Sequence, residues 1–172
     1  MTPSFHSLGA LQQDAASGLS YRVLQPQPER PRALVVLLHG VGGQETDLAD
    51  LAAGVDPGTL VVLVRSRLQL GPGQFGWFRV TFTAEGPRIA ADEAEDSRHA
   101  LIRLIDHLQA AHGVEARRTV LAGFSQGGIM SASVALTAPE RVPASSLPHS
   151  PTPPGPASPL PGLHPPCPQP PA

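Results

Sequence analysis

The sequence predicts an α/β protein whose mostly parallel sheet carries helices on both faces. Three observations predict this class. Continuous apolar runs recur along the chain, segments with helical periodicity alternate with them, and glycine-rich turns lie close to their ends. A length of 172 residues leaves room for one such domain.

Four segments have the composition of strands. Residues 19–24 form a short one, which ends at a loop punctuated by prolines. Residues 33–38, 60–64 and 119–124 are almost unbroken apolar runs, as expected for parallel strands buried on both faces. We therefore expect residues 33–38 to form a central strand. Residues 65–88 are predicted to be a long loop, which holds the only tryptophan.

Three helices are predicted between and after these strands. Residues 45–53 carry apolar side chains at helical spacing. Residues 91–112 form the strongest helix, because apolar side chains recur every three, four or seven positions and acids crowd the first turns. Gly113 stands just past its end, where glycine is favoured. Residues 126–137 form the third helix, which Pro139 terminates.

Composition narrows the classes of partner. A formal charge of −2 and a pI near 6.4 argue against nucleic acid or an anionic membrane surface. No apolar stretch is long enough for a membrane span, and the first 20 residues lack the features of a secretion signal, so we predict a cytoplasmic protein. The single cysteine, Cys167, offers neither a disulfide nor a zinc site. The acids of residues 92–96 are interpreted as a helix start, and we expect no metal and no cofactor.

A G-x-S-x-G pentapeptide, residues 123–127, lies between an apolar run and a helix. This is the layout of a nucleophile elbow, in which small residues let the backbone turn sharply and present Ser125 at the start of a helix. Such a site needs two backbone N–H groups for the developing oxyanion. Gln126 follows the serine directly, and Val41 lies in a glycine-rich turn after an earlier strand, so these two are predicted to be the oxyanion-hole donors.

Four segments resemble the small carboxylesterases and phospholipases of the α/β-hydrolase fold, a family that includes the acyl-protein thioesterases. The matching segments are residues 37–43, 69–78, 123–128 and 131–141. The resemblance implies Ser125 as nucleophile, and hydrolysis of small-molecule carboxylic esters or thioesters without metal or cofactor. It also puts Trp77 in a loop that lies beside the acyl pocket in relatives. Trp77 is therefore interpreted either as a substrate-pocket residue or as a packing residue.

The chain departs from the family after the helix that follows Ser125. Family members place an acid and then a histidine after the nucleophile, whereas Glu140 is the only acid here. In residues 142–172, 13 of 31 positions are proline and no periodicity survives, so this tail is predicted to be disordered. We expect residues 1–141 to be an α/β-hydrolase domain without its C-terminal third, inactive or weak as it stands. Its bare final strand is expected to favour self-association.

The simplest account of the tail is translation in a shifted frame near residue 141. The chain contains no Lys and no Asn, which indicates GC-rich coding, and such coding readily yields proline codons when shifted. The alternative is a non-catalytic pseudo-hydrolase whose Pro151-x-x-Pro154 spacing binds an SH3-like groove. A third interpretation is a binding module that holds carboxylates at the oxyanion site without turnover.

The histidines are interpreted as non-catalytic. His39 ends a strand and is expected to bond the backbone of the following loop. Three others belong to one predicted helix and are expected to be solvated: His99, His107 and His112. His149 and His164 lie in the proline-rich tail, which cannot place a general base.

Overall fold

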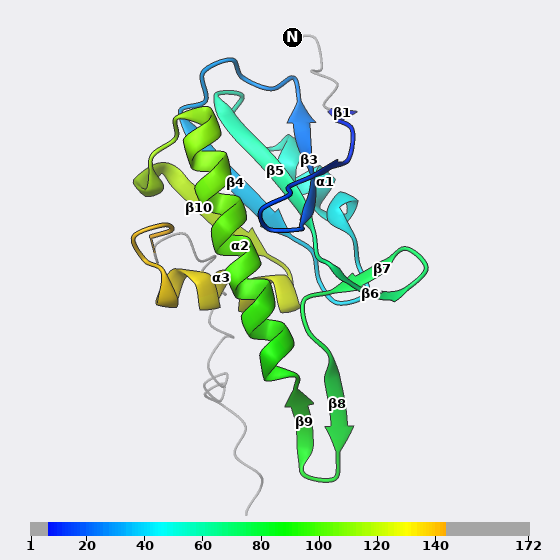
Figure 1. Ribbon diagram of the computed structural model, residues 1–172. Coiled ribbons are helices and arrows are strands. Elements are labelled where there is room, and N and C mark those ends of the chain that lie inside the picture. The colour runs from blue at the N-terminus through cyan, green and yellow to red at the C-terminus, as the bar shows by residue number, and fades with distance from the viewer. Residues whose placement is uncertain (1–6, 144–172) are drawn as a thin grey trace, which may run out of the picture.

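The computed structural model describes residues 7–143, in which a six-stranded sheet forms the centre of the molecule (Figure 1). Its strands are β1 (Ser7–Leu8), β2 (Gln12–Gln13), β3 (Ser20–Gln25), β4 (Ala33–Leu38), β5 (Thr59–Arg65) and β10 (Thr119–Gly123). The spatial order is β1-β3-β5-β4-β10, and β2 pairs with β3. Strands β5, β4 and β10 run parallel, whereas β3 is antiparallel to β5. The predicted central position of residues 33–38 is confirmed, because β4 lies between two parallel neighbours.

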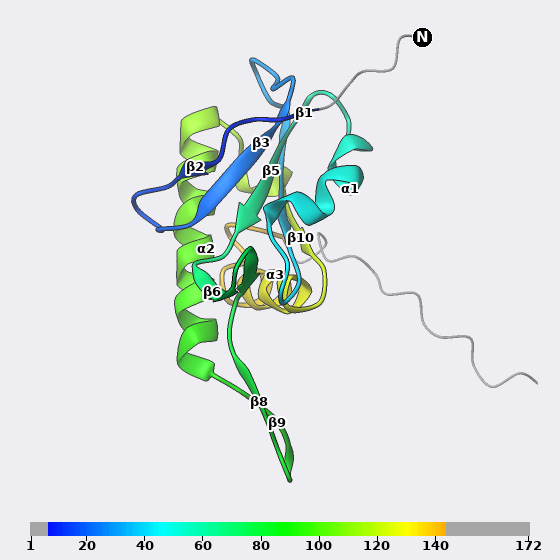
Figure 2. The same ribbon diagram turned by 90° about the vertical axis from the view of Figure 1, so that its right-hand side faces the viewer.

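Helices cover both faces of this sheet (Figure 2). They are the 3-10 turn η1 (Glu45–Leu48), α1 (Ala49–Ala53), α2 (Ala91–His112), the 3-10 turn η2 (Ala116–Arg118) and α3 (Gln126–Thr137). The α2 and α3 helices pack on one face, while η1 and α1 pack on the other. The structure therefore confirms the predicted layers, and it reproduces the predicted bounds of β4, α2 and α3.

The alternation of side chains along β4 separates the two halves of the core. Leu34, Val36 and Leu38 point into the larger cluster, which includes Leu101 and Leu104 of α2. Leu37 points to the opposite face, and Ala52 of α1 belongs to the cluster there. A strand that buries both of its faces needs apolar side chains at every position, which explains the continuous run in the sequence.

The segment predicted to be one long loop is instead two β-hairpins. The first pairs β6 (Leu68–Gly71) with β7 (Gln74–Gly76), and the second pairs β8 (Val80–Thr83) with β9 (Gly86–Ile89). Gly73 and Gly86 adopt positive φ values of 67° and 114° at the two turns, a conformation that glycine tolerates without steric cost. The second hairpin extends away from the body of the molecule (Figures 1 and 2). These strands are too short for hydrophobic periodicity to reveal them.

The predicted domain boundary after residue 141 stays a prediction, because the structure describes only two residues beyond it, 142 and 143. Val142, the first residue assigned to the tail, is fully buried in the larger core cluster. The prediction of disorder for the rest of the tail concerns residues 144–172, which lie outside the described range. Between residues 7 and 143, no helix combines the length and the apolar character needed to cross a membrane.

Candidate active site

Ser125 occupies a sharp turn between β10 and α3. Its φ of 52° and ψ of −118° make it the only non-glycine residue with a positive φ between residues 7 and 143. Such a conformation costs of order 1–3 kcal/mol and persists only where the surrounding structure enforces it. The side chain is exposed rather than packed. The predicted elbow geometry is therefore present.

Two glycines make this turn possible, because backbone lies directly against them. A Cβ on Gly127 would lie 2.3 Å from the Leu38 carbonyl oxygen and 2.6 Å from that of His39. A Cβ on Gly123 would lie 2.4 Å from the Gly127 carbonyl carbon. The Phe124 N–H donates to the Leu38 oxygen at 3.0 Å, so the elbow is fastened to the end of β4. These approaches give a physical reason for small residues on both sides of the serine.

The turn after β4 lies against the elbow. We call residues 40–43 the glycine loop. Gly42 has a φ of 76°, and the Gly43 N–H donates to the Gly40 oxygen at 3.2 Å. A Cβ on Gly40 would lie 3.5 Å from the Ser125 Cβ, so the loop and the serine are neighbours. Within the described residues, neither the Val41 nor the Gln126 N–H donates to a backbone carbonyl.

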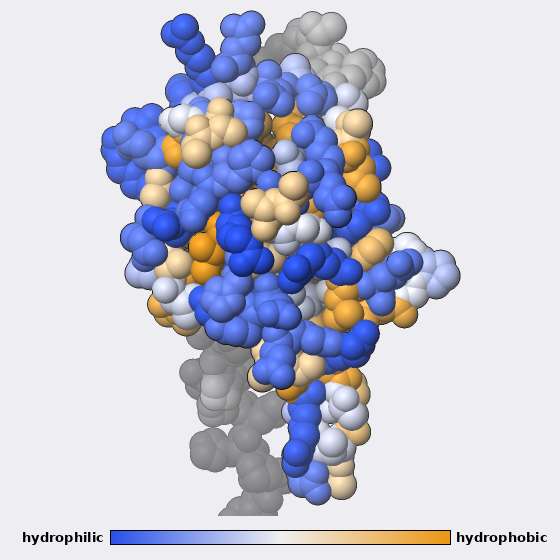
Figure 3. Space-filling model, in the orientation of Figure 1, coloured by the Kyte–Doolittle hydropathy of each residue, from blue (hydrophilic) through white to orange (hydrophobic). Residues whose placement is uncertain are grey.

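One pocket of about 570 Å³ brings three of the four predicted site residues together. Val41, Ser125 and Gln126 all line it. Most of its remaining wall is apolar and comes from the hairpins, the segment between them and α3: Leu70, Phe78, Val80, Phe82, Pro87, Ile89 and Ile129. Phe82 and Ile89 are 82% and 51% exposed, and the hydrophobic colour of Figure 3 gathers near the hairpins. An apolar pocket with a few convergent polar groups is the usual form of a small-molecule site.

Comparison with known proteins agrees with this geometry. The sequence model of the Phospholipase/Carboxylesterase family matches residues 19–146. The chain belongs to this phospholipase/carboxylesterase family. The family resemblance inferred from the motifs is thereby confirmed, together with the α/β-hydrolase fold.

The individual proteins that match this chain are longer than it is. Esterase YpfH of Escherichia coli (strain K12) is 34% identical over 108 residues, which cover 60% of this chain and 46% of that protein. The carboxylesterase from Mesorhizobium loti has a TM-score of 0.61 at 25% identity, and the match covers 76% of this chain and 59% of that one. Acyl-protein thioesterase 2 of Zea mays, at 21% identity and a TM-score of 0.51, shares the fold over 67% of this chain and 50% of its own. The chain thus spans about half the length of the curated relative.

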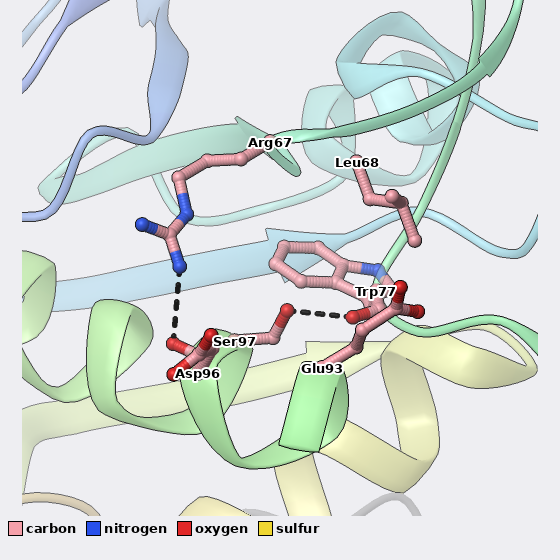
Figure 4. A pocket seen from close by; sticks show the side chains of 6 residues that line it. All are labelled: Arg67, Leu68, Trp77, Glu93, Asp96 and Ser97. Carbon is pink, nitrogen blue, oxygen red and sulfur yellow. Dashed lines mark hydrogen bonds between the residues drawn. The ribbon is translucent and has the colours of Figure 1, made fainter. Parts of the chain in front are cut away.

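Trp77 is fully buried and does not line the pocket at Ser125. Its indole N–H donates to the His39 carbonyl oxygen at 2.9 Å, and its ring stacks on the His39 ring with 5.2 Å between centroids. It lines a separate pocket of about 320 Å³ with Arg67, Leu68, Glu93, Asp96 and Ser97 (Figure 4). The sequence left two roles open for Trp77. These contacts are those of a packing residue, and a contact of Trp77 with substrate stays a prediction.

Gln126 has a side-chain role that the sequence did not suggest. Its side-chain Oε1 accepts from the backbone N–H of Trp77 at 3.0 Å, and its Nε2 donates to the Phe78 carbonyl oxygen at 2.9 Å. These two bonds join the start of α3 to the segment between the hairpins. The amide side chain is buried, so its pairing fixes the residue whose backbone N–H is the predicted oxyanion donor.

His39 is a structural histidine, as predicted. Its Nε2 accepts from the Ser66 N–H at 3.2 Å, so in the neutral ring Nδ1 carries the hydrogen and donates to the Gly40 oxygen at 2.7 Å. Burial lowers the pKa of the imidazole, while the bond to Gly40 opposes that shift. Both ring nitrogens are occupied by backbone, so His39 is not available as a general base.

The histidines of α2 lie away from this chemistry. His107 is not simply solvated, as the sequence suggested, because its Nδ1 lies 2.5 Å from the Asp14 carboxylate. Asp14 is buried and also accepts from the Ser17 N–H at 2.7 Å. His149 and His164 lie outside the described residues. Within residues 7–143, no side chain is hydrogen-bonded to the Ser125 hydroxyl, and in this range the serine has no base beside it.

Proposed function

We propose that this chain carries the nucleophile and the oxyanion hole of a serine hydrolase that acts on small-molecule carboxylic esters or thioesters. The observation that carries the proposal is the strained conformation of Ser125 at the pocket that Val41 and Gln126 also line. A turn with a purely structural role does not require a residue in a costly conformation whose hydroxyl is exposed. Nor does it require two backbone amides without backbone acceptors next to that hydroxyl.

The chemistry assigns one role to each group. The Ser125 Oγ attacks the carbonyl carbon and its proton passes to a base, while the carbonyl π electrons move to the oxygen. The Val41 and Gln126 N–H groups donate to that oxyanion, and the positive end of the α3 dipole lies at the same position. Collapse of the tetrahedral intermediate expels the alcohol or thiol, and water then hydrolyses the acyl-serine. The proposal calls for no metal and no cofactor.

The rate of hydrolysis by this chain is limited by how readily the Ser125 hydroxyl loses its proton. A serine without an imidazole in reach stays protonated and is a weak nucleophile. We therefore propose that turnover by the chain itself is weak. Loss of triad members leaves a rate of about 10³- to 10⁴-fold over water in well-built hydrolases.

A fluorophosphonate probe tests the assignment of Ser125. Its phosphorus forms a bond to Oγ as the P–F bond breaks, which releases fluoride and a proton, and the adduct is found by mass spectrometry. We expect slow labelling of the wild type, in keeping with a serine that has no base beside it, none of Ser125→Ala, and wild-type labelling of Ser133→Ala, a matched control eight residues further along the chain on α3. Equal labelling of the wild type and Ser125→Ala would refute the proposed nucleophile and favour the carboxylate-binding module.

A p-nitrophenyl acetate assay on the same three proteins tests the weak turnover. We expect less than about 1 turnover per second, below the ordinary range of enzymes. Faster turnover that is absent from Ser125→Ala would show that a base outside residues 7–143 serves the serine.

Self-association is proposed on separate grounds. Within the described residues, β10 pairs with β4 on one side only, which leaves the other edge of a largely apolar parallel strand without a partner. An unpaired strand edge is a template for another strand. The alternative role of a proline-rich interaction tail concerns residues outside the described range.

A further inference from the structure

The glycine loop holds few interactions of its own, yet it carries Val41. Val41 is 56% exposed, and the loop's internal hydrogen bond is the long one from Gly43 to Gly40. A segment with little buried surface and a left-handed glycine has no intrinsic reason to keep one conformation. Whatever fixes the Val41 amide relative to Ser125 must therefore come from neighbouring elements.

Phe75, on β7, supplies the first contact. The Gly42 N–H donates to the Phe75 oxygen at 2.8 Å, and the Phe75 N–H donates to the Gly43 oxygen at 2.9 Å. This two-bond bridge pairs the residues after Val41 with the first hairpin. This bridge by itself cannot hold the glycine loop rigidly, because an isolated two-stranded hairpin is only marginally stable.

Arg65, at the end of β5, holds that hairpin from the side of the sheet. Its guanidinium lies over the Phe75 ring, 4.8 Å from the centroid. Its Nε and Nη2 donate to the Glu45 carboxylate at 2.6 and 2.9 Å. A planar guanidinium can stack on a ring and bind a carboxylate in two places at once, so Arg65 joins Phe75 to Glu45.

Glu45, the first residue of η1, lies two positions after the glycine loop. Its side chain is fully buried, and it accepts a third bond from the Arg22 Nε at 2.8 Å. Burial by itself raises the pKa of this carboxyl, but the bonds from Arg65 and Arg22 outweigh it and lower the pKa, so the group is ionised at neutral pH. Buried ion pairs stabilise folds little compared with apolar side chains of the same size, because desolvation offsets the attraction. Stability alone therefore does not account for this group.

We propose that Glu45, Arg65 and Phe75 are positioning residues that fix the glycine loop, and with it the Val41 amide, at the pocket of Ser125. Glu45 fastens the chain just after the loop, Phe75 fastens the loop itself, and Arg65 connects the two. The inference rests on the proposed function of Val41, and it gives a role to three residues to which neither the motifs nor the family resemblance assigned one.

The test combines two readouts on the full chain. The first is fluorophosphonate labelling of Ser125, with the maximal rate separated from the half-saturating concentration. The second is hydrogen–deuterium exchange of the peptide that covers residues 40–43. The variants are Phe75→Leu, which removes the ring, Phe75→Tyr, which keeps it, and Glu45→Gln. Glu95→Gln, which removes the half-exposed carboxylate that pairs with Arg98 on α2, is the matched control.

We expect Phe75→Leu to lower the maximal labelling rate and to speed exchange of the loop by about two- to thirtyfold, the factor that a cation–π contact corresponds to. The half-saturating concentration should not change, since the pocket walls are intact. Phe75→Tyr should restore both values, Glu45→Gln should lose at least as much as Phe75→Leu, and Glu95→Gln should match the wild type.

The inference is overturned if Phe75→Leu stays within twofold of the wild type in both readouts, or if Phe75→Tyr does not restore them. Should Glu45→Gln fail to fold by circular dichroism, the two Phe75 variants decide alone. If the wild type is labelled no more than Ser125→Ala, the proposed function fails, and loop exchange still decides whether these residues hold the loop.

Discussion

Replacement of Gly127 by alanine tests the packing on which the whole site depends. The new Cβ would lie 2.3 Å from the Leu38 oxygen, whereas even a weak C–H···O contact needs about 3.3 Å, so α3 and the end of β4 must separate by about 1 Å. The atoms in the way are backbone, which cannot rotate aside as a side chain can.

The cost follows from what that separation breaks. Overpacking costs about 1–3 kcal/mol, and stretching the bond from the Phe124 N–H takes a donor away from the carbonyl of the buried Leu38, which costs about 1–3 kcal/mol. Alanine recovers about 1 kcal/mol of helix propensity. We therefore expect Gly127→Ala to lower the free energy of unfolding by about 1–5 kcal/mol, a large part of the total for a small domain.

Gly128→Ala is the matched control. Its Cβ would lie 3.2 Å from the Gly123 oxygen, a contact that a shift of a few tenths of an ångström relieves, in the same helical turn. We expect its stability to stay within about 0.5 kcal/mol of the wild type or to rise, because the helix gains from alanine.

Urea unfolding measures both variants. Trp77 is the only tryptophan and is fully buried, so its fluorescence reports loss of the native core. A difference of less than about 1 kcal/mol between the two variants, the size of an average surface or core change, would refute the packing argument.

Three further outcomes are expected. Ser125→Gly should be more stable than Ser125→Ala by about 0.5–1.5 kcal/mol in thermal unfolding, because glycine adopts a φ of 52° without strain; equal stabilities would show that the turn is not strained. Asp14→Asn should lose about 1.5–3 kcal/mol at pH 7, the value of hydrogen bonds to a charged group. Burial raises the pKa of the Asp14 carboxyl, but the bonds from Ser17 and His107 lower it below its ordinary 3.8. The stabilisation is therefore complete above pH 3.8 and is lost as the pH falls through the lower folded value, so the two unfolding free energies should converge in acid; a constant gap would contradict this. Val120→Lys, on the open edge of β10, should shift the chain towards monomer in sedimentation velocity, and a wild type that is already monomeric would rule out pairing through that edge.

The candidate site was predictable from the sequence only where the residue types that the chemistry needs also produce a recognisable local turn. Ser125 could be found because an elbow demands glycine at fixed positions, and the close approaches at Gly123 and Gly127 show why. Glu45 and Phe75 could not be found this way, since the contacts proposed to give them a role join residues ten or more positions apart and no local rule links them. Gly71 and Gly73 were the one local signal for the turn of the first hairpin.

The sequence by itself determined the elements whose identity depends on short-range physics. Apolar periodicity set the bounds of α2, the glycine after it set its end, and a continuous apolar run marked β4 as a strand buried on both faces. Tertiary structure alone decided which distant residues meet. The order of strands placed Val41 beside Ser125, the stacking on His39 buried Trp77, and the approach of the β2–β3 turn to α2 paired Asp14 with His107. Periodicity reports which face of an element is apolar, but the partner of that face is chosen only when the whole sheet assembles.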